Sequence, residues 1–248
     1  MSVGNIKFGI GFSDYVGSRN SSKISFSDGV VNGNTLFVID TEHATHLLLS
    51  DAGGVLGIVA LNHENISFTD LITVDKTRTY KEIRFENTPV EILERTIDSA
   101  NAVERAIDAG RITLAADSLG ASQTMLDMAV SYSKERKQFN RVIGSFQAVK
   151  HMCAEMTSEL EPCYSLVWHA AHSFDNDEDN SKLMACHAKS HVSEISKEVS
   201  KKATEVHGGM GFTDLLGLHY WFKRIGLNRQ LLGAPEVVRA EAAKIQGF

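Results

Sequence analysis

The sequence predicts an α+β protein in which a small antiparallel β barrel or sandwich, residues 1–94, precedes an antiparallel four-helix bundle, residues 95–248. Two observations predict this fold. Short β-branched and aromatic runs separated by glycine turns fill the first part. Long stretches with an apolar residue every three or four positions fill the second. Because 43% of the 248 residues are apolar, the chain can bury a core.

The first 94 residues contain five runs with strand character, namely Lys23–Phe26, Thr35–Ile39, His46–Leu49, Leu56–Ala60 and Lys81–Phe85. Turn residues such as Ser27-Asp28-Gly29 and Asp51-Ala52-Gly53-Gly54 separate them. We expect the clearest hairpin turn at Asn32–Asn34, between ISFSDGVV and TLFVI. This spacing is typical of an antiparallel meander or a small barrel.

Beyond Asp98 the apolar periodicity becomes helical, and the predicted helices lie at Ile112–Tyr132, 147–173, 182–206 and Ala234–Ile245. An acidic loop, 175–180, separates the second helix from the third. Gly208 and the glycines after it end the third helix. Pro235 occupies the favoured first turn of the last.

The overall charge and composition exclude several classes. The net charge of -6 argues against a nucleic-acid binder, and no apolar run reaches the ~18 residues of a membrane span. The start of the chain does not resemble a signal peptide. Cys153, Cys163 and Cys186 form no CxxC pair, so we expect reduced thiols and a cytoplasmic protein.

The sequence contains little that supports a metal site or a hydrolase active site. The pairs His169/His172 and His187/His191 each share a helix face, but a zinc site needs a further ligand and no HExxH is present. We therefore interpret them as ordinary surface or interface histidines. No G-x-S-x-G occurs for a serine nucleophile.

Two segments carry a more specific signal: YSKERKQFNRVIGSFQ at 132–147 and EVHGGMGF at 205–212. An arginine beside an amide, with a Gly-Gly corner that admits close backbone approach, suits a pyrophosphate. Each segment alone favours the plainer interpretation, a charged helix end or a glycine-rich turn. Together they resemble the acyl-CoA dehydrogenase family, whose bundle carries YxxxRxQFGxxixxFQ and later hGGxGf. The resemblance runs from Arg111 to Lys244 and extends into NGNTLFVIDTEHATHLLLS and VDKTRTYKEIRFENTPVE of the β part.

The resemblance implies a set of residues that reach across a subunit interface to the FAD of the neighbouring chain. They are Arg136, Lys137, Gln138, Phe139, Phe146, Gln147, Glu205, Gly208 and Gly209. Glu205 stands where the family usually has Gln, and a carboxylate repels a pyrophosphate unless it is hydrogen-bonded or neutralised. Asn140 replaces the usual glycine of QFG.

The same resemblance implies that the catalytic base is missing. Dehydrogenation of an acyl-CoA needs a carboxylate to take the α-proton while the flavin takes a hydride. The family carries it at one of two positions, which here are Leu232 and Gly110. Relocated bases would be Asp108 or Glu236.

Other parts of the family's pattern are also reduced. Where the family has a flavin-contacting Trp-(Ile)-Thr/Ser segment, this chain has Phe37-Val38-Ile39-Asp40. Of the family's phosphate-contacting TEPxxGSD motif, at most Gly11-Phe12-Ser13-Asp14 is retained. The family's N-terminal helical domain has no counterpart in the sequence.

The resemblance thus points to a non-catalytic subunit of a heteromeric FAD-dependent acyl-CoA dehydrogenase. A full-length partner, in an α2β2 assembly, would bind most of the acyl-CoA, such as a bulky or steroid side chain. One alternative is a scaffold or regulatory relic of this fold that binds no flavin. The other is a homomeric flavoprotein with a relocated base.

Overall fold

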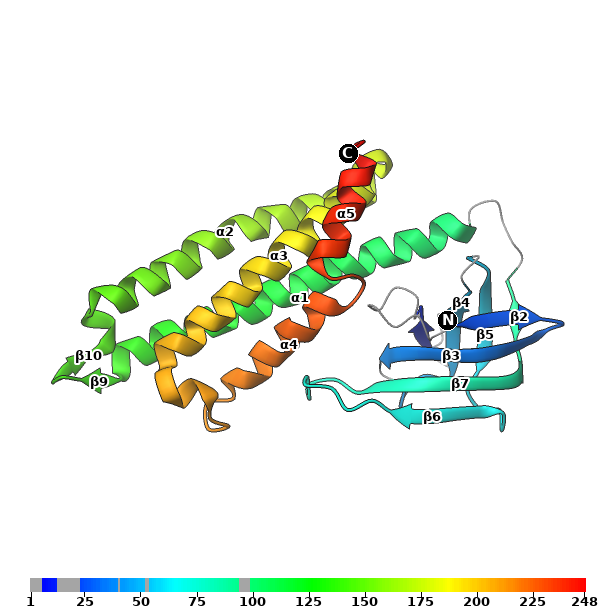
Figure 1. The fold of residues 1–248 in the computed structure, drawn as a ribbon, viewed down its shortest axis with the longest axis horizontal. Helices are drawn as coiled ribbons and strands as arrows, with labels where there is room; N and C mark the ends of the chain where they lie inside the picture. The colour runs from blue at the N-terminus through cyan, green and yellow to red at the C-terminus, as the bar shows by residue number, and fades with distance from the viewer. Residues whose placement is uncertain (1–5, 13–22, 40, 52–53, 94–98) are drawn as a thin grey trace. The chain divides into compact units, whose positions relative to one another are not determined.

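A computed structural model describes residues 6–12, 23–39, 41–51, 54–93 and 99–248. The chain divides into two compact units, Met1–Ile107 and Asp108–Phe248. The first contains two four-stranded sheets and the first turns of a long helix, and the second is mainly helical (Figure 1). The predicted domain boundary at 94/95 falls at residues 94–98, outside the described part, and stays a prediction.

The first unit contains two four-stranded sheets. Their orders are β1-β4-β5-β8 and β2-β3-β7-β6. The strands are β1 Phe8–Gly11, β2 Ile24–Ser27, β3 Val30–Ile39, β4 His46–Ser50, β5 Leu56–Ala60, β6 Ile66–Asp70, β7 Tyr80–Pro89 and β8 Glu91–Ile92. Buried residues of both sheets, among them Val31, Leu47, Val59 and Phe85, form one core. The predicted fold class is confirmed, although β1 pairs parallel with β4.

The predicted hairpin turn at Asn32–Asn34 is wrong. The turn lies at Asp28–Gly29, because Ser27 pairs with Val30 and β3 continues through Asn32 and Asn34. Asp28 and Gly29 both have positive φ, 50° and 76°, as the two central residues of a type I′ hairpin turn require. Gly33 instead sits at a bulge, where a Cβ would lie 1.8 Å from the Lys23 carbonyl oxygen.

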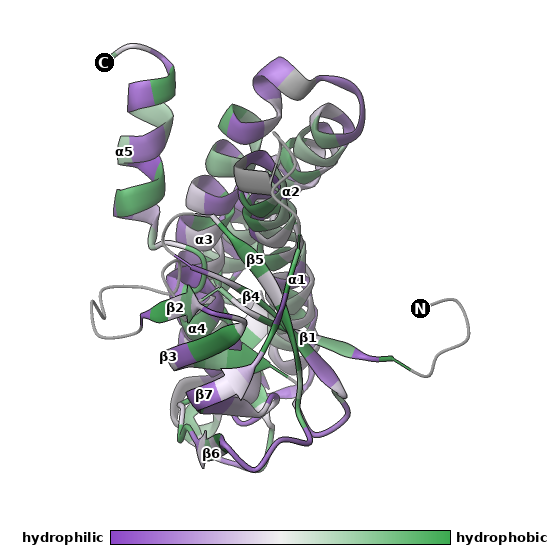
Figure 2. Ribbon diagram, turned by 90° about the vertical axis from the view of Figure 1, so that its right-hand side faces the viewer, coloured by the Kyte–Doolittle hydropathy of each residue, from purple (hydrophilic) through white to green (hydrophobic). Residues whose placement is uncertain are grey.

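Five helices make up most of the rest of the described chain, with two short 3-10 segments and one short two-stranded hairpin between the first two helices. They are α1 Ser99–Glu135, α2 Gln147–Asn176, α3 Glu178–His207, α4 Leu218–Gln230 and α5 Pro235–Ile245, with η2 Ile143–Ser145 and η3 Gly208–Phe212. Apolar residues of α1 to α4 form the main core, including Met125, Leu160, Val192 and Ile225. Hydrophobic and hydrophilic residues are interspersed along α5 (Figure 2), and its buried residues Pro235, Val238 and Ala242 lie three or four positions apart, as on one face of an amphipathic helix.

Two details of the helical unit differ from the sequence prediction. The acidic loop is much shorter than expected, because α2 and α3 leave only Asp177 between them. Its carboxylate accepts a hydrogen bond from the Asn180 backbone N–H at 3.4 Å and so caps α3. Helix α4 was not predicted, although it buries Leu218, Ile225 and Asn228. The ends at Gly208 and Pro235 are confirmed.

Candidate functional site

The predicted Arg136–Phe139 segment forms the hairpin that connects α1 to α2. Strands β9 Lys137–Gln138 and β10 Arg141–Val142 pair across a turn at Phe139 and Asn140. Both turn residues have positive φ, 52° and 61°. Asparagine tolerates this conformation better than most residues, which explains how Asn140 replaces the family's glycine. Arg136, Lys137, Gln138 and Phe139 are all exposed, Phe139 to 86%.

Phe146 and Gln147 follow directly, at the start of α2. The Phe146 ring meets Phe139 edge-on at 6.1 Å, and the Arg141 guanidinium lies 3.9 Å from its centroid. The Gln147 amide lies 2.9 Å from a ring nitrogen of His151. The hairpin is therefore fixed by aromatic and cation–π contacts while its polar ends stay accessible.

A ring stack brings the second motif to the same end of the bundle (Figure 1). Tyr132, one turn before Arg136, stacks on His207 with centroids 4.6 Å apart. His207 is buried and its Nδ1 lies 2.7 Å from the Ala203 carbonyl oxygen. Gly208 follows at once, with φ 59°. The fold thus joins two motifs that are far apart in the sequence.

The glycine corner is open. A Cβ added at Gly208 or Gly209 would meet nothing within 4 Å, and both residues are exposed. Glu205 is also exposed, in the last turn of α3. This surface offers accessible backbone, a guanidinium and amides, which is a donor set for a phosphate-bearing cofactor.

The two positions where the family holds its base lie in contact. A Cβ built on Gly110 would lie 2.4 Å from Leu232 Cδ1, so the leucine side chain covers this glycine. Leu232 has φ 55° and Gly233 φ 102°, in the turn between α4 and α5. Neither position supplies a group that can accept a proton.

Arg111 holds this turn from α1. Its Nε donates to the Leu232 carbonyl oxygen at 3.0 Å, and its second terminal nitrogen donates to Glu241 at 2.7 Å. Burial opposes ionisation of Glu241, but the hydrogen bond and charge of Arg111 outweigh it and lower the pKa of this carboxyl. Burial raises the pKa of the adjacent Cys186 thiol to about 11.

The relocated-base alternatives are both engaged by arginines. Asp108 is buried and lies 3.6 Å from Arg111. Glu236 lies 2.6 Å from Arg229, and a backbone hydrogen bond together with that guanidinium lowers the pKa of Glu236. A carboxylate held in its ionised form by an arginine is a weakened proton acceptor.

The segment that replaces the family's flavin-contacting tryptophan lies in β3. Phe37 has φ 55° at a bulge, and its ring meets Tyr80 edge-on at 6.2 Å. Val38 is fully buried. Asp40, Ser13 and Asp14 lie outside the described residues. The described part of the segment therefore presents no indole or hydroxyl to a flavin ring.

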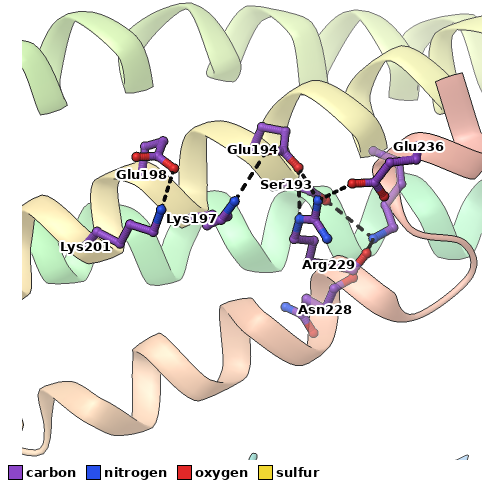
Figure 3. A network of polar contacts seen from close by, with 9 residues as sticks. Ser193, Glu194, Lys197, Glu198, Lys201, Asn228, Arg229 and Glu236 are labelled. Carbon is purple, nitrogen blue, oxygen red and sulfur yellow. Dashed lines mark hydrogen bonds and ion pairs between the residues drawn. The ribbon is translucent and has the colours of Figure 1, made fainter.

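Sequence reasoning missed a polar network among α3, α4 and α5. Arg229 bridges Glu194 at 2.7 Å and Glu236 at 2.6 Å (Figure 3). Lys189 is fully buried, and its ammonium donates to the carbonyl oxygens of Asn228 at 2.5 Å and Arg229 at 3.2 Å. No sequence motif marks these contacts, since Lys189 and Glu194 of α3 lie 39 and 35 residues before their partners Asn228 and Arg229 in α4.

The profile of the acyl-CoA dehydrogenase C-terminal domain matches residues 100–246 of this chain. The chain belongs to the acyl-CoA dehydrogenase family. It is 43% identical over 108 residues to the caffeyl-CoA reductase-Etf complex subunit CarC of Acetobacterium woodii, a match covering 44% of this chain and 28% of that protein. It is 26% identical over 250 residues to the probable acyl-CoA dehydrogenase YngJ of Bacillus subtilis, covering 94% and 64% respectively. The chain thus spans less than two thirds of the length of these relatives.

Solved acyl-CoA dehydrogenases share the fold. The enzyme from Geobacillus kaustophilus superposes with a TM-score of 0.88 at 18% identity, covering 98% of this chain and 69% of that one. A Tcur3481-Tcur3483 steroid ACAD superposes with a TM-score of 0.84 at 22% identity, covering 97% and 67%. Among the described residues of this acyl-CoA dehydrogenase homologue, no helix has the length and apolarity to cross a membrane. The same residues contain no cluster of three potential metal ligands.

Proposed function

We propose that the chain is a subunit of a heteromeric FAD-dependent acyl-CoA dehydrogenase, in which it completes the partner's FAD site and lacks a base of its own. One observation carries this proposal: Leu232 packs over Gly110, so both positions of the family's base hold groups that cannot take a proton. The α,β-dehydrogenation of an acyl-CoA thioester then requires a carboxylate from a second, full-length chain.

The open end of the bundle supports the other half of the proposal. Bound FAD would supply the hydride acceptor. The residues that fit its pyrophosphate are the exposed Arg136 and Gln138, with the open backbone at Gly208 and Gly209. The described part of Phe37–Asp40 offers no comparable fit for the flavin ring in this chain. We therefore assign FAD to a site shared with the partner.

The names of two relatives agree with a multi-chain assembly. CarC is a subunit of a caffeyl-CoA reductase-Etf complex, and the solved steroid ACAD carries two protein names. By analogy we propose an α2β2 assembly in the cytoplasm that acts on a bulky acyl-CoA, such as one with a steroid side chain.

The experiment removes Arg136 from the complex. The tagged chain is purified from its native host, the co-purified partner is identified by mass, and bound flavin is measured by absorbance. Charge-assisted hydrogen bonds contribute roughly 1.5–3 kcal/mol each, so Arg136→Ala should weaken FAD binding about ten- to hundred-fold while assembly persists. Lys134→Ala, which removes an exposed charge from the preceding helical turn, is the matched control.

Three outcomes distinguish the shared FAD site from its alternatives. A complex depleted of flavin only by Arg136→Ala supports the shared site. Full flavin in that variant refutes the role of Arg136. An assembly that carries no flavin at all favours the scaffold alternative.

A further inference from the structure

A surface cleft of about 380 Å³ lies between helices of the second unit, and its lining includes none of the residues predicted to contact FAD. It is lined by Leu166 of α2, by His187, Ser190 and His191 of α3, and by Arg239 of α5. Its volume lies in the range of roughly 300–1,000 Å³ that is typical of small-ligand sites. Three of the five lining side chains are nitrogen bases or cations, and none is a carboxylate.

The three nitrogen-bearing side chains approach the cleft from two helices. His187 and His191 are four positions apart on α3 and so share one helix face. Arg239 comes from α5, which packs on α3 through Cys186, Val238 and Ala242. Donors from two helices can meet one anion from different directions.

The carboxylates closest to this cleft along α3 and α5 are already paired with other arginines. Glu194 and Glu236 both bind Arg229, at 2.7 and 2.6 Å (Figure 3). Glu241 binds Arg111 at 2.7 Å. The charge of Arg239 contributes to the lowered pKa of Glu236, but among the described residues no ion pair within 4 Å joins a carboxylate to Arg239, His187 or His191. The cleft therefore holds the positive charge of Arg239 beside two imidazoles, and no carboxylate is among its lining residues.

We propose that this cleft binds the phosphate group of a small organic phosphate. A guanidinium grips two phosphate oxygens at once, and imidazoles donate to the remaining ones. Leu166 supplies an apolar wall for the organic part, and the cleft is larger than a bare ion requires. The Ser190 hydroxyl donates to the Cys186 carbonyl oxygen at 2.8 Å, so its proton is not available to a phosphate and the residue serves only as part of the cleft wall.

The test is titration calorimetry of the whole chain with adenosine 3′-monophosphate, inorganic phosphate and adenosine. We expect saturable binding of the nucleotide, weaker binding of inorganic phosphate and none of adenosine. Arg239→Gln and His191→Gln should each weaken nucleotide binding about tenfold or more, because each removes a charge-assisted contact. The controls are Lys201→Gln, exposed further along α3, and His169→Gln, exposed on α2. All four side chains are exposed, so the variants should fold.

Comparison of inorganic phosphate with the nucleotide distinguishes a site for free phosphate from a site for an organic phosphate. Equal affinity for inorganic phosphate and the nucleotide would assign the cleft to free phosphate, whereas tighter nucleotide binding would assign it to an organic phosphate and support the proposal fully. No saturable binding of either probe overturns it. So does an equal loss in the control variants, since that would indicate only the general charge of the surface.

Discussion

The buried Lys189 makes the stability of the helical unit dependent on pH in a definite direction. Its ammonium donates to the carbonyl oxygens of Asn228 and Arg229 near the end of α4. The ammonium also lies 3.4 Å from the Ser193 hydroxyl. Burial lowers the pKa of Lys189 to about 7, and the charges of Arg111 and Arg229 add to the effect. Lys189→Met keeps an unbranched side chain and removes the titrating group.

The sign follows from proton binding in the two states. Unfolded lysine has a pKa of about 10.4, so between pH 7 and pH 10 the unfolded chain binds a proton that the folded chain lacks. Stability therefore rises with pH through this window, by up to about 1.4 kcal/mol per pH unit. Below pH 7 both states are protonated, and the desolvation penalty is fully present. Relative to Lys189→Met, the wild type should gain about 2 kcal/mol between pH 7.5 and 9.5.

The assay is urea unfolding followed by far-ultraviolet circular dichroism, which reports mainly the helices. The quantity of interest is the free energy of unfolding of wild type minus that of Lys189→Met at each pH, because other titrating groups, including the thiols, cancel in this difference. Lys201→Met, which removes an exposed lysine that pairs with Glu198 on the same helix, is the control for the loss of one positive charge. A flat profile for Lys189→Met would refute the reasoning.

Three further predictions concern the remaining sites. Leu232→Glu places a carboxylate at the family's base position, yet the purified chain alone should stay colourless and without acyl-CoA dehydrogenase turnover; turnover would show that only the base was missing. Burial raises the pKa of Cys163 and of Cys186 to about 11, so both thiols should resist alkylation at neutral pH until urea unfolds the chain; rapid labelling of either in the native protein would contradict this. The Arg224 guanidinium contacts both carboxylate oxygens of Asp117, at 2.9 and 2.6 Å. Arg224→Ala should therefore lower the free energy of unfolding by about 1–3 kcal/mol, and Arg224→Lys should restore only part of this loss. Full restoration by lysine would argue against a two-point contact.

The main elements of the fold could be predicted because their signals are local. Strand and helix periodicities, Gly208 at the end of α3 and Pro235 at the start of α5 each depend on a few neighbouring residues. The hairpin turn was misplaced because Asn32-Gly33-Asn34 and Asp28-Gly29 are both turn-forming sequences. Only the cross-strand register, with Ser27 opposite Val30, distinguishes them.

Helix α4 escaped prediction because part of its buried face is polar. Asn228 is fully buried, and its amide donates to Asp117 at 2.5 Å and to Ser118 at 3.2 Å. A periodicity that counts only apolar residues does not recognise such a face. The partner residues lie on α1, far away in the sequence, so the satisfaction of this amide is visible only in the fold.

The candidate site, like the fold, could be predicted only in part. The resemblance to the family could indicate Leu232 and Gly110 as its base positions, but not that the leucine side chain covers the glycine. Nor could it predict the stack of Tyr132 on His207, which places the two motif segments at one end of the bundle. Both findings are tertiary contacts between side chains on different helices.

Backbone contacts hold the turn between α4 and α5. Arg111 binds the Leu232 carbonyl oxygen, and Lys189 binds a carbonyl near the end of α4 just before it. Neither contact depends on the side chain at position 232, so leucine can stand where the resemblance places a carboxylate without loss of these two contacts. The loss of a proton acceptor at this position is therefore separable from these contacts of the bundle. Under the function proposed above, such a chain would lack the chemistry at this turn and would still offer Arg136 and the glycine corner to a neighbouring subunit.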